Sequence, residues 1–191
     1  MAAETEAAQV LAAADRLFND RGVQAVGMDS IRDAANVPLK RLYRLFPSKS
    51  ALVCAVLEQR DRDVRTAIAD YVGARAETPR ERILAVFDYL LEWFADPAFR
   101  GCLFINTVGE LGGTSDDIGR IARRHKLAMR DYLAELVAEC SFPAELADQL
   151  MILANGAMAT AAVQGDGPRA AQHARAAAVT LLAAAEYREI S

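Results

Sequence analysis

The sequence predicts an all-α fold of nine helices. No segment shows the sustained alternation of apolar and polar residues that marks a half-buried strand, whereas apolar residues recur three and four positions apart along most of the chain. Alanine, leucine, arginine and glutamate dominate, and all four favour helices. Because 53% of its 191 residues are hydrophobic, the chain can bury a substantial core.

Proline, glycine and capping residues mark where the expected helices begin and end. Gly22 suits the left-handed position after the first helix, and Ser48 suits the N-cap of a long one. Thr78 and Glu81 form a capping-box pattern around Pro79. The expected helices cover residues 5–20, 29–35, 38–45, 48–71, 79–94, 102–111, 114–139, 143–164 and 168–187.

The charge distribution separates the first 50 residues from the rest of the chain. Residues 1–50 hold seven Lys or Arg against six Asp or Glu, whereas the rest of the chain holds fifteen against twenty. Residues 34–57 contain no acid, and their basic residues are Lys40, Arg41, Arg44 and Lys49. A short basic segment in a chain of net charge −4 indicates a local site for a polyanion.

Residues 27–52 carry the clearest functional pattern. A short helix, a break at Asn36-Val37 and a second short helix form a helix-turn-helix pattern. Apolar residues such as Ile31 and Leu42 can hold the two helices at a steep angle, while three basic residues share one side of the second helix. One helix fits the major groove of DNA, and phosphates attract lysine, arginine and tyrosine side chains.

This segment resembles the N-terminal DNA-binding domain of TetR/AcrR-type transcriptional regulators. The resemblance spans about residues 8–57 and rests on the order and spacing of Phe18, Arg21-Gly22, Val26, Ile31, Ala34-Ala35, Val37, Leu42-Tyr43, Phe46-Pro47-Ser48-Lys49 and Leu52. It implies a helix-turn-helix DNA-binding domain over residues 1–50 and a helical ligand-binding and dimerisation domain over residues 51–191. The second domain fits the family only in the number and length of its helices.

Three positions depart from the usual pattern of the family. Asn36 stands where the turn usually has glycine, and asparagine tolerates the left-handed conformation. Asp29 stands near the position where the family usually has a hydroxyl that contacts a phosphate. We expect Asp29 to cap the helix instead, and Ser30 to supply the phosphate contact. Pro38 replaces the serine or threonine that usually begins the recognition helix, where proline fits but offers no hydroxyl.

The basic pattern and the resemblance together give the expected DNA contacts. The resemblance implies that the Tyr43 hydroxyl contacts a phosphate. Lys49 lies in the first turn of an expected helix, a position that also favours an anion. Two alternatives stay open: the basic residues form only a solvated face, or Tyr43 is half-buried in the core. The expected contacts are Ser30, Pro38, Leu39, Lys40, Arg41, Tyr43, Arg44 and Lys49.

Aromatic residues gather between residues 87 and 104, which indicates either ordinary core or the lining of a small-molecule cavity. Cys102 stands at an expected helix N-terminus, so it is either a small buried residue or a reactive thiol. His125 is expected at or near the surface, and neither the histidines nor the cysteines show a metal-ligand spacing. The expected ligand-binding residues are Phe87, Trp93, Cys102, Asn106, Glu110 and Asn155.

The last two expected helices are rich in alanine and carry apolar stripes. These stripes pack either within the chain or against a second copy, because small residues allow close approach in both cases. The resemblance implies a homodimer with a four-helix interface, for which C2 symmetry is the usual arrangement. The expected interface residues are Leu146, Leu150, Leu153, Ala157, Ala161, Ala174, Ala178 and Leu181.

These expectations combine into a bacterial, cytoplasmic regulator that occupies a palindromic operator in double-stranded DNA and leaves it when a small-molecule effector binds. We expect no cofactor, no metal and no membrane partner, since no apolar run of about 18 residues and no secretory signal pattern occurs. The chain lacks the GxSxG, HExxH, GxGxxG and P-loop motifs, which disfavours an enzyme. The alternative is a helical small-molecule-binding or interaction protein without operator binding.

Overall fold

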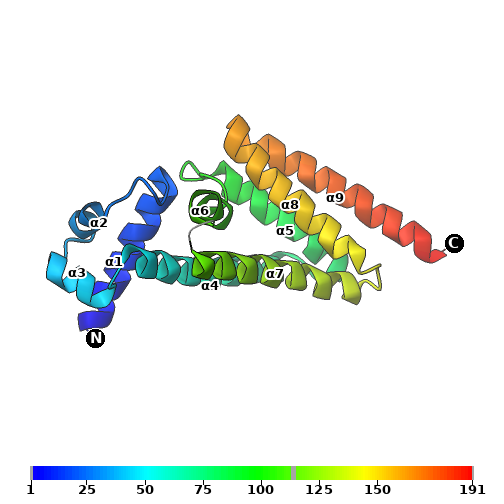
Figure 1. Cartoon of the computed structure of the whole chain (residues 1–191). Helices are drawn as coiled ribbons and strands as arrows, with labels where there is room; N and C mark the ends of the chain where they lie inside the picture. Colours follow the sequence, from blue (N-terminus) through cyan, green and yellow to red (C-terminus); the bar gives the residue numbers. More distant parts are fainter. Residues whose placement is uncertain (1, 113–114, 191) are drawn as a thin grey trace. The chain divides into compact units, whose positions relative to one another are not determined.

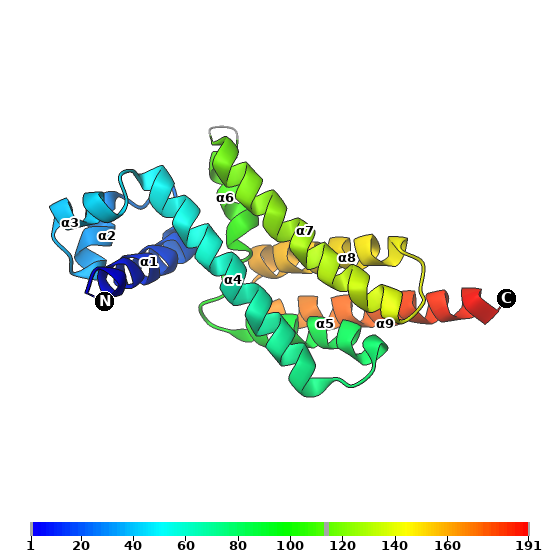
Figure 2. The same ribbon diagram turned by 90° about the horizontal axis from the view of Figure 1, so that it is seen from below.

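The computed structural model describes residues 2–112 and 115–190, and the regular structure in these residues is α-helical, as predicted. Nine helices lie within these ranges (Figures 1 and 2). They are α1 (Ala2–Arg21), α2 (Met28–Ala35), α3 (Leu39–Leu45), α4 (Lys49–Arg75), α5 (Pro79–Ala95), α6 (Leu103–Leu111), α7 (Asp116–Glu139), α8 (Glu145–Gln164) and α9 (Gly167–Ile190).

Most residues expected to begin or end a helix do so. Gly22 follows α1 with a φ of +81°, and Asn36 follows α2 in the left-handed conformation, with φ 52° and ψ 48°. The Ser48 hydroxyl accepts a hydrogen bond from a backbone N–H in the first turn of α4 at 3.1 Å. Thr78 and Glu81 make both hydrogen bonds of the capping box at the start of α5. These local predictions are confirmed. Each could be made from the sequence because it depends only on neighbouring residues.

Two details of the helix-turn-helix segment differ from the prediction. Helix α2 begins at Met28 with Gly27 as its N-cap, and Asp29, expected to cap it, forms an ion pair with Arg32 at 3.0 Å. Asp29 lies inside the first turn, so its side chain faces the next turn rather than the free N–H groups. Pro38 is the N-cap of α3 rather than its first helical residue.

The chain divides into two compact units. Unit 1 comprises Met1–Arg62 and Cys102–Arg124, and unit 2 comprises Asp63–Gly101 and His125–Ser191. Helices α1, α2, α3 and α6 lie in unit 1, whereas α5, α8 and α9 lie in unit 2 (Figure 1). Helices α4 and α7 each begin in unit 1 and end in unit 2, so the first part of each helix belongs to unit 1 and the second part to unit 2.

The core of unit 1 holds α2 and α3 against α1 and the first half of α4. Phe18 of α1, Ile31 of α2, Leu42 of α3 and Leu52 of α4 are all essentially inaccessible to solvent. Burial of such a side chain contributes about 1.5–3 kcal/mol relative to leaving it exposed. This apolar contact fixes the orientation of the two short helices, which are too short to be stable alone.

In unit 2, α8 and α9 run antiparallel side by side and pack on α5 (Figures 1 and 2). Phe87 of α5, Leu150 of α8 and Leu182 of α9 are fully buried. Gly167, the first residue of α9, lies so close to α5 that a Cβ there would stand 2.4 Å from the carbonyl oxygen of Phe94. Alanines on α8 and α9 allow a similarly close approach.

His125 is deeply buried, so the expectation that it lies at or just below the surface is wrong. It is 4% exposed because it stands on the inward face of α7, four residues after buried Ile121 and four before buried Met129. Within the described residues, no group of three or more His, Cys, Asp or Glu side chains is placed to hold a metal ion. One described helix, α8, is long and apolar enough to cross a membrane, but its apolar stripe is part of the unit 2 core.

Candidate nucleic-acid interface

Helices α2 and α3 form a helix-turn-helix in which a short turn positions the second helix. The backbone N–H groups of Asn36 and Val37 donate to carbonyls of the last turn of α2 at 3.2 and 3.3 Å, which ends that helix. The left-handed Asn36 reverses the chain, and the buried Val37 anchors it. The carbonyl of Pro38 then accepts the N–H groups of Arg41 and Leu42 at 2.8 and 3.0 Å, which begins α3.

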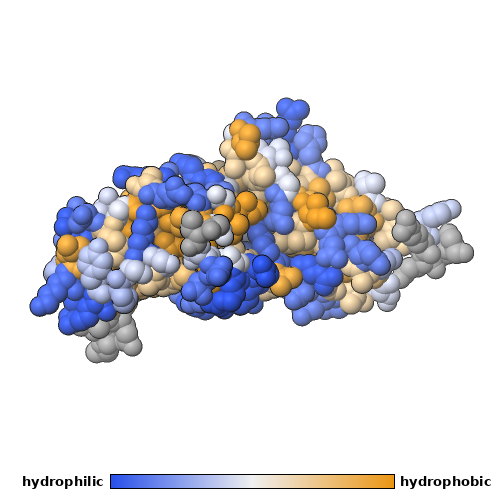
Figure 3. Space-filling view, viewed as in Figure 1, coloured by the Kyte–Doolittle hydropathy of each residue, from blue (hydrophilic) through white to orange (hydrophobic). Residues whose placement is uncertain are grey.

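Helix α3 presents one face to solvent. Leu39, Lys40, Tyr43 and Arg44 are exposed on it, while Leu42 is buried beneath them. Tyr43 is 47% exposed, so its ring lies outside the core and its hydroxyl is available to a partner. The surface over α2 and α3 is mostly hydrophilic, with a small hydrophobic spot (Figure 3). A short helix with an exposed, basic and aromatic face is suited to a DNA groove.

Arg41 lies apart from the other basic residues of α3. Its guanidinium Nε donates to the carboxylate of Glu6 on α1, so its side chain lies along unit 1 rather than projecting from it. The sequence interpretation grouped Arg41 with Lys40 and Arg44 on one free side. No signal in the sequence pointed to Glu6, because the two residues are 35 positions apart.

The remaining expected contacts surround α3. Lys49 begins α4, and its ammonium group donates to the carbonyl oxygen of Gln24 in the turn between α1 and α2 at 3.3 Å. Ser30 on α2 and Pro38 before α3 are exposed. The N-terminus of α4 also carries the positive end of the helix dipole, which attracts anions. Unit 1 therefore places the eight expected DNA-contact residues on or beside one helix-turn-helix, with Arg41 turned toward α1.

The six residues expected to bind a ligand are not gathered in one unit. Three lie in unit 1: Cys102 is the buried N-cap of α6, Asn106 is exposed on α6, and the carboxylate of Glu110 accepts two backbone N–H groups. The other three lie in unit 2, where they are part of the core or paired. Phe87 is fully buried.

Trp93 and Asn155 of unit 2 also have partners. The Trp93 ring packs edge-on against Phe99 with centroids 5.2 Å apart, in an aromatic cluster that includes Phe94. The side-chain carbonyl of Asn155 accepts a hydrogen bond from Lys126 at 2.7 Å. The aromatic segment thus contributes mainly to packing at this end of α5.

Unit 2 contains hollows that the sequence did not indicate. One, of about 390 Å³, lies between α4 and α7 and is lined by residues that include Arg65, Ile68, Met129, Tyr132 and Glu135. Burial raises the pKa of Tyr132 above its ordinary value. The polar residues that line this hollow come from two helices that are far apart in sequence, so no local motif marks them.

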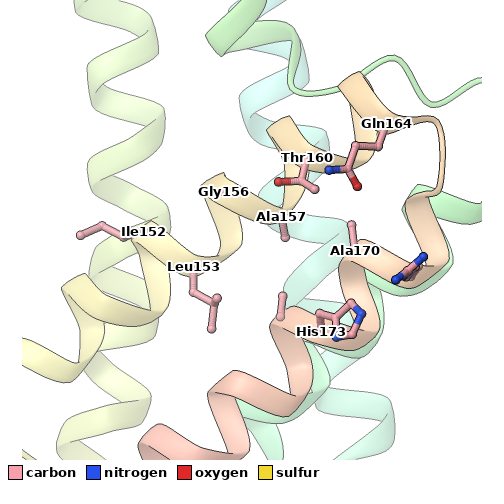
Figure 4. A pocket seen from close by; sticks show the side chains of 10 residues that line it. Ile152, Leu153, Gly156, Ala157, Thr160, Gln164, Ala170 and His173 are labelled. Carbon is pink, nitrogen blue, oxygen red and sulfur yellow. The ribbon is translucent and has the colours of Figure 1, made fainter.

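A second hollow, of about 590 Å³, is open to solvent between α8 and α9 (Figure 4). Ile152, Gly156 and Thr160 line it from α8, and Ala170 and His173 line it from α9. Ile152 is 72% exposed, and Val163 on α8 is 86% exposed. This side of the helix pair is apolar and lacks cover from its own chain.

Of the residues expected at the dimer interface, Leu153, Ala157 and Ala174 line this hollow, and most of the others lie in the core of unit 2. Six of the eight residues are buried within this chain. Leu153 and Leu181 are partly buried beside that core. The six buried residues are Leu146, Leu150, Ala157, Ala161, Ala174 and Ala178.

Comparisons with known protein families match both parts of the chain. Residues 10–56 match the model of the bacterial regulatory proteins of the tetR family. Residues 79–178 match the model of the tetracyclin repressor-like C-terminal domain. The first match contains α2, α3 and the start of α4, and the second contains α5 to α8 and part of α9.

Individual proteins show the same likeness over longer stretches. The HTH-type transcriptional regulator YjdC of Escherichia coli is 24% identical over 151 residues, which cover 78% of this chain and 79% of YjdC. An HTH-type transcriptional regulator of Mycobacterium tuberculosis is 32% identical over 127 residues, 62% of this chain and 60% of its own. The crystal structure of SCO4454, a TetR-family transcriptional regulator from Streptomyces coelicolor, superposes with a TM-score of 0.88 at 28% identity, covering 95% of this chain and 96% of that one.

Proposed function

The chain belongs to the TetR family of bacterial regulatory proteins and is a DNA-binding transcriptional regulator, and on this premise we propose that it is a homodimeric repressor. It occupies a palindromic operator and is released when a small molecule binds. The observation that carries this proposal is the exposed face of α3, with Lys40, Tyr43 and Arg44 beside Lys49 at the start of α4.

The chemistry of this face suits the DNA backbone and the major groove. Lys40, Arg44 and Lys49 supply positive charge for phosphates, and the Tyr43 hydroxyl can donate to a phosphate oxygen. A C2 dimer places two α3 helices in successive major grooves, with half-sites about 34–36 Å apart or a multiple of that spacing. Symmetry of the protein then requires symmetry of the operator.

For the dimer, we assign the interface to the solvent-facing side of α8 and α9. The exposed Ile152 and Val163 and the open hollow between the two helices support this assignment, since a partner's helices would cover them. The resulting four-helix contact is isologous, so each copy presents the same surface. A soluble dimer of this kind acts in the cytoplasm, where its operator is.

For the effector, we assign the hollow between α4 and α7 of unit 2. Its volume of about 390 Å³ falls within the usual range for small-molecule sites, and Tyr132, Arg65 and Glu135 offer polar groups beside apolar Ile68 and Met129. A ligand there touches α4, the helix whose first residue is Lys49. A tenfold loss of operator affinity requires about 1.4 kcal/mol of preference for the DNA-incompetent form.

Selection of bound duplexes from a random pool tests operator binding directly. We expect an inverted repeat and an affinity that falls steeply with salt. Six cations, three from each subunit, predict a slope of log affinity against log salt of about −5. Failure to select any duplex, or a flat salt dependence, would leave a helical small-molecule-binding or interaction protein as the better interpretation.

The effector site has its own test. A compound that raises the melting temperature of the wild type and releases the selected operator is measured again on Ala128→Trp, which fills the hollow, and on Ala74→Trp, an exposed site on α4. We expect only the first variant to lose the response. An equal response in both variants would place the effector elsewhere.

A further inference from the structure

Glu110 joins α6 to the turn between α1 and α2. Its carboxylate accepts the backbone N–H of Val23 at 3.1 Å through one oxygen and that of Gln24 at 2.7 Å through the other. In return, the side-chain amide of Gln24 donates to the backbone carbonyl of Glu110 at 2.7 Å. Three hydrogen bonds therefore connect segments that are 86 or 87 residues apart, all within unit 1.

The turn is shaped to receive this carboxylate. Gly22 has a φ of +81°, and a Cβ at this position would stand 3.0 Å from a Glu110 carboxylate oxygen. Glycine thus provides both the left-handed backbone and the space for the acid. Hydrogen bonds from two N–H groups to a charged carboxylate are stronger than bonds between neutral groups. The backbone of the turn is therefore arranged to bind the Glu110 carboxylate, which distinguishes this contact from a chance approach of a surface side chain.

Gln24 also contacts the DNA-facing side of unit 1. Its backbone carbonyl accepts the hydrogen bond from Lys49, the first residue of α4. The same turn leads directly to Gly27, the N-cap of α2. The position of Gln24 therefore sets where the Lys49 ammonium group lies and where the helix-turn-helix begins.

We propose that Glu110 is a positioning residue for operator binding: from α6, it fixes the α1–α2 turn and, through Gln24, the phosphate-contacting Lys49. This inference rests on the proposed DNA-binding face. The sequence predicted that Glu110 binds a ligand. Under this proposal Glu110 instead supports the DNA-bound form.

The first test replaces Glu110 by glutamine. Glutamine offers one carbonyl oxygen, and its NH₂ group opposes the second backbone N–H, so one hydrogen bond is lost and the charge is removed. We expect Glu110→Gln to weaken binding to the selected operator about tenfold, the size of one charge-assisted hydrogen bond. Asp20→Asn, an equal charge change at an exposed site on α1, is the control and should not weaken binding.

The second test distinguishes positioning from a general loss of stability. In the wild type, Lys49→Ala weakens operator binding because a phosphate contact is lost. In the Glu110→Gln background Lys49 is no longer held in place, so the same substitution should change affinity less than about twofold. Lys40→Ala should cost the same in both backgrounds. Equal costs of Lys49→Ala in both backgrounds, or unchanged affinity of Glu110→Gln, would overturn the proposal.

Circular dichroism confirms that each variant is folded before its affinity is compared. If Glu110→Gln does not fold, Glu110→Asp keeps the charge but is one methylene too short to reach the turn, and the same loss of coupling to Lys49 is expected. Wild-type protein that binds no duplex would refute the proposed function, and this inference with it. Wild-type binding with additive losses refutes only the role of Glu110.

Discussion

Arg41 on the recognition helix α3 is paired with Glu6 on α1. Both side chains are about two-thirds covered, and the guanidinium Nε is the donor. The Arg41 Nε must therefore leave Glu6 before it can itself contact DNA, and a carboxylate lies beside the proposed DNA-contacting face. We therefore expect the pair to oppose DNA binding in two ways: it occupies a cation, and its carboxylate repels the phosphates.

Glu6→Gln should consequently tighten operator binding. A partly exposed ion pair contributes about 0.2–1 kcal/mol, so its removal should raise affinity up to about fivefold. The measurement is a titration of labelled operator with each protein at one salt concentration. Asp70→Asn, an exposed site on the unit 2 half of α4, provides the matched charge change and should have a smaller effect. Weaker binding by Glu6→Gln would show that Glu6 supports α3 instead.

Tyr43→Phe and Arg41→Ala should differ in how they affect sequence preference. Tyr43 is exposed and its hydroxyl suits a phosphate, so its loss should weaken binding by about the same factor on operator and random DNA. Arg41, once released from Glu6, can reach a base edge, so its loss should relax preference at one position by about 1–3 kcal/mol. Affinities for a panel of single-base operator variants test this. Identical profiles for the two variants would refute the distinction.

The helices and their ends could be predicted because they depend on residues close in sequence. Gly22, Asn36 and Thr78 each act on the turn that contains them, and the structure places them as expected. The helix-turn-helix was predictable for the same reason, since its core residues and its basic face lie within about 25 positions. Asp29 was misjudged as the N-cap by two positions, because α2 starts at Met28 and Gly27 is its N-cap.

The contacts that could not be predicted join distant residues or depend on faces that look alike. Glu110 and Glu6 contact segments 87 and 35 residues away, and no local pattern marks either acid. On α8 and α9, alanine is frequent on all sides, so the buried stripe and the exposed one have similar hydrophobicity. Some residues expected at the dimer interface, such as Leu150 and Ala178, therefore lie on the inward stripe, whereas Ala157 lines the open hollow.

The exposed stripe gives a test of the dimer. Val163→Glu should produce a monomer, because a carboxylate in an apolar helix interface is left without a partner. The fold should persist, since the side chain is 86% exposed within the chain. Sedimentation equilibrium measures the mass, and Leu127→Glu, at an exposed apolar position on α7, is the control that should stay dimeric. A monomer binds one half-site only, so operator affinity should fall when dimer formation is lost. A dimeric Val163→Glu would place the interface on another surface.

The capping box at the start of α5 should contribute measurably to stability. Thr78→Ala removes the acceptor for the Glu81 backbone N–H and should lower the free energy of unfolding by about 1 kcal/mol. Urea unfolding followed by circular dichroism measures the change. Thr66→Ala, at an exposed position inside α4, removes the same atoms without a cap and should not destabilise. Equal midpoints for Thr78→Ala and wild type would contradict this assignment.

Tyr71 at the end of α4 should titrate late. Burial, followed by the hydrogen bond to Glu92 at 2.8 Å, raises the pKa of Tyr71 from 10.0 to about 12. A raised pKa means that folding favours the protonated phenol, so this stabilisation is complete below about pH 10 and is lost as the pH rises through about 12. Ultraviolet absorbance of the phenolates should show a step near pH 12 that Tyr71→Phe reduces and Tyr187→Phe, at an exposed site on α9, leaves in place. A Tyr71→Phe titration that instead loses absorbance near pH 10 and keeps the step near pH 12 would mean that Glu92 does not hold the phenol in solution.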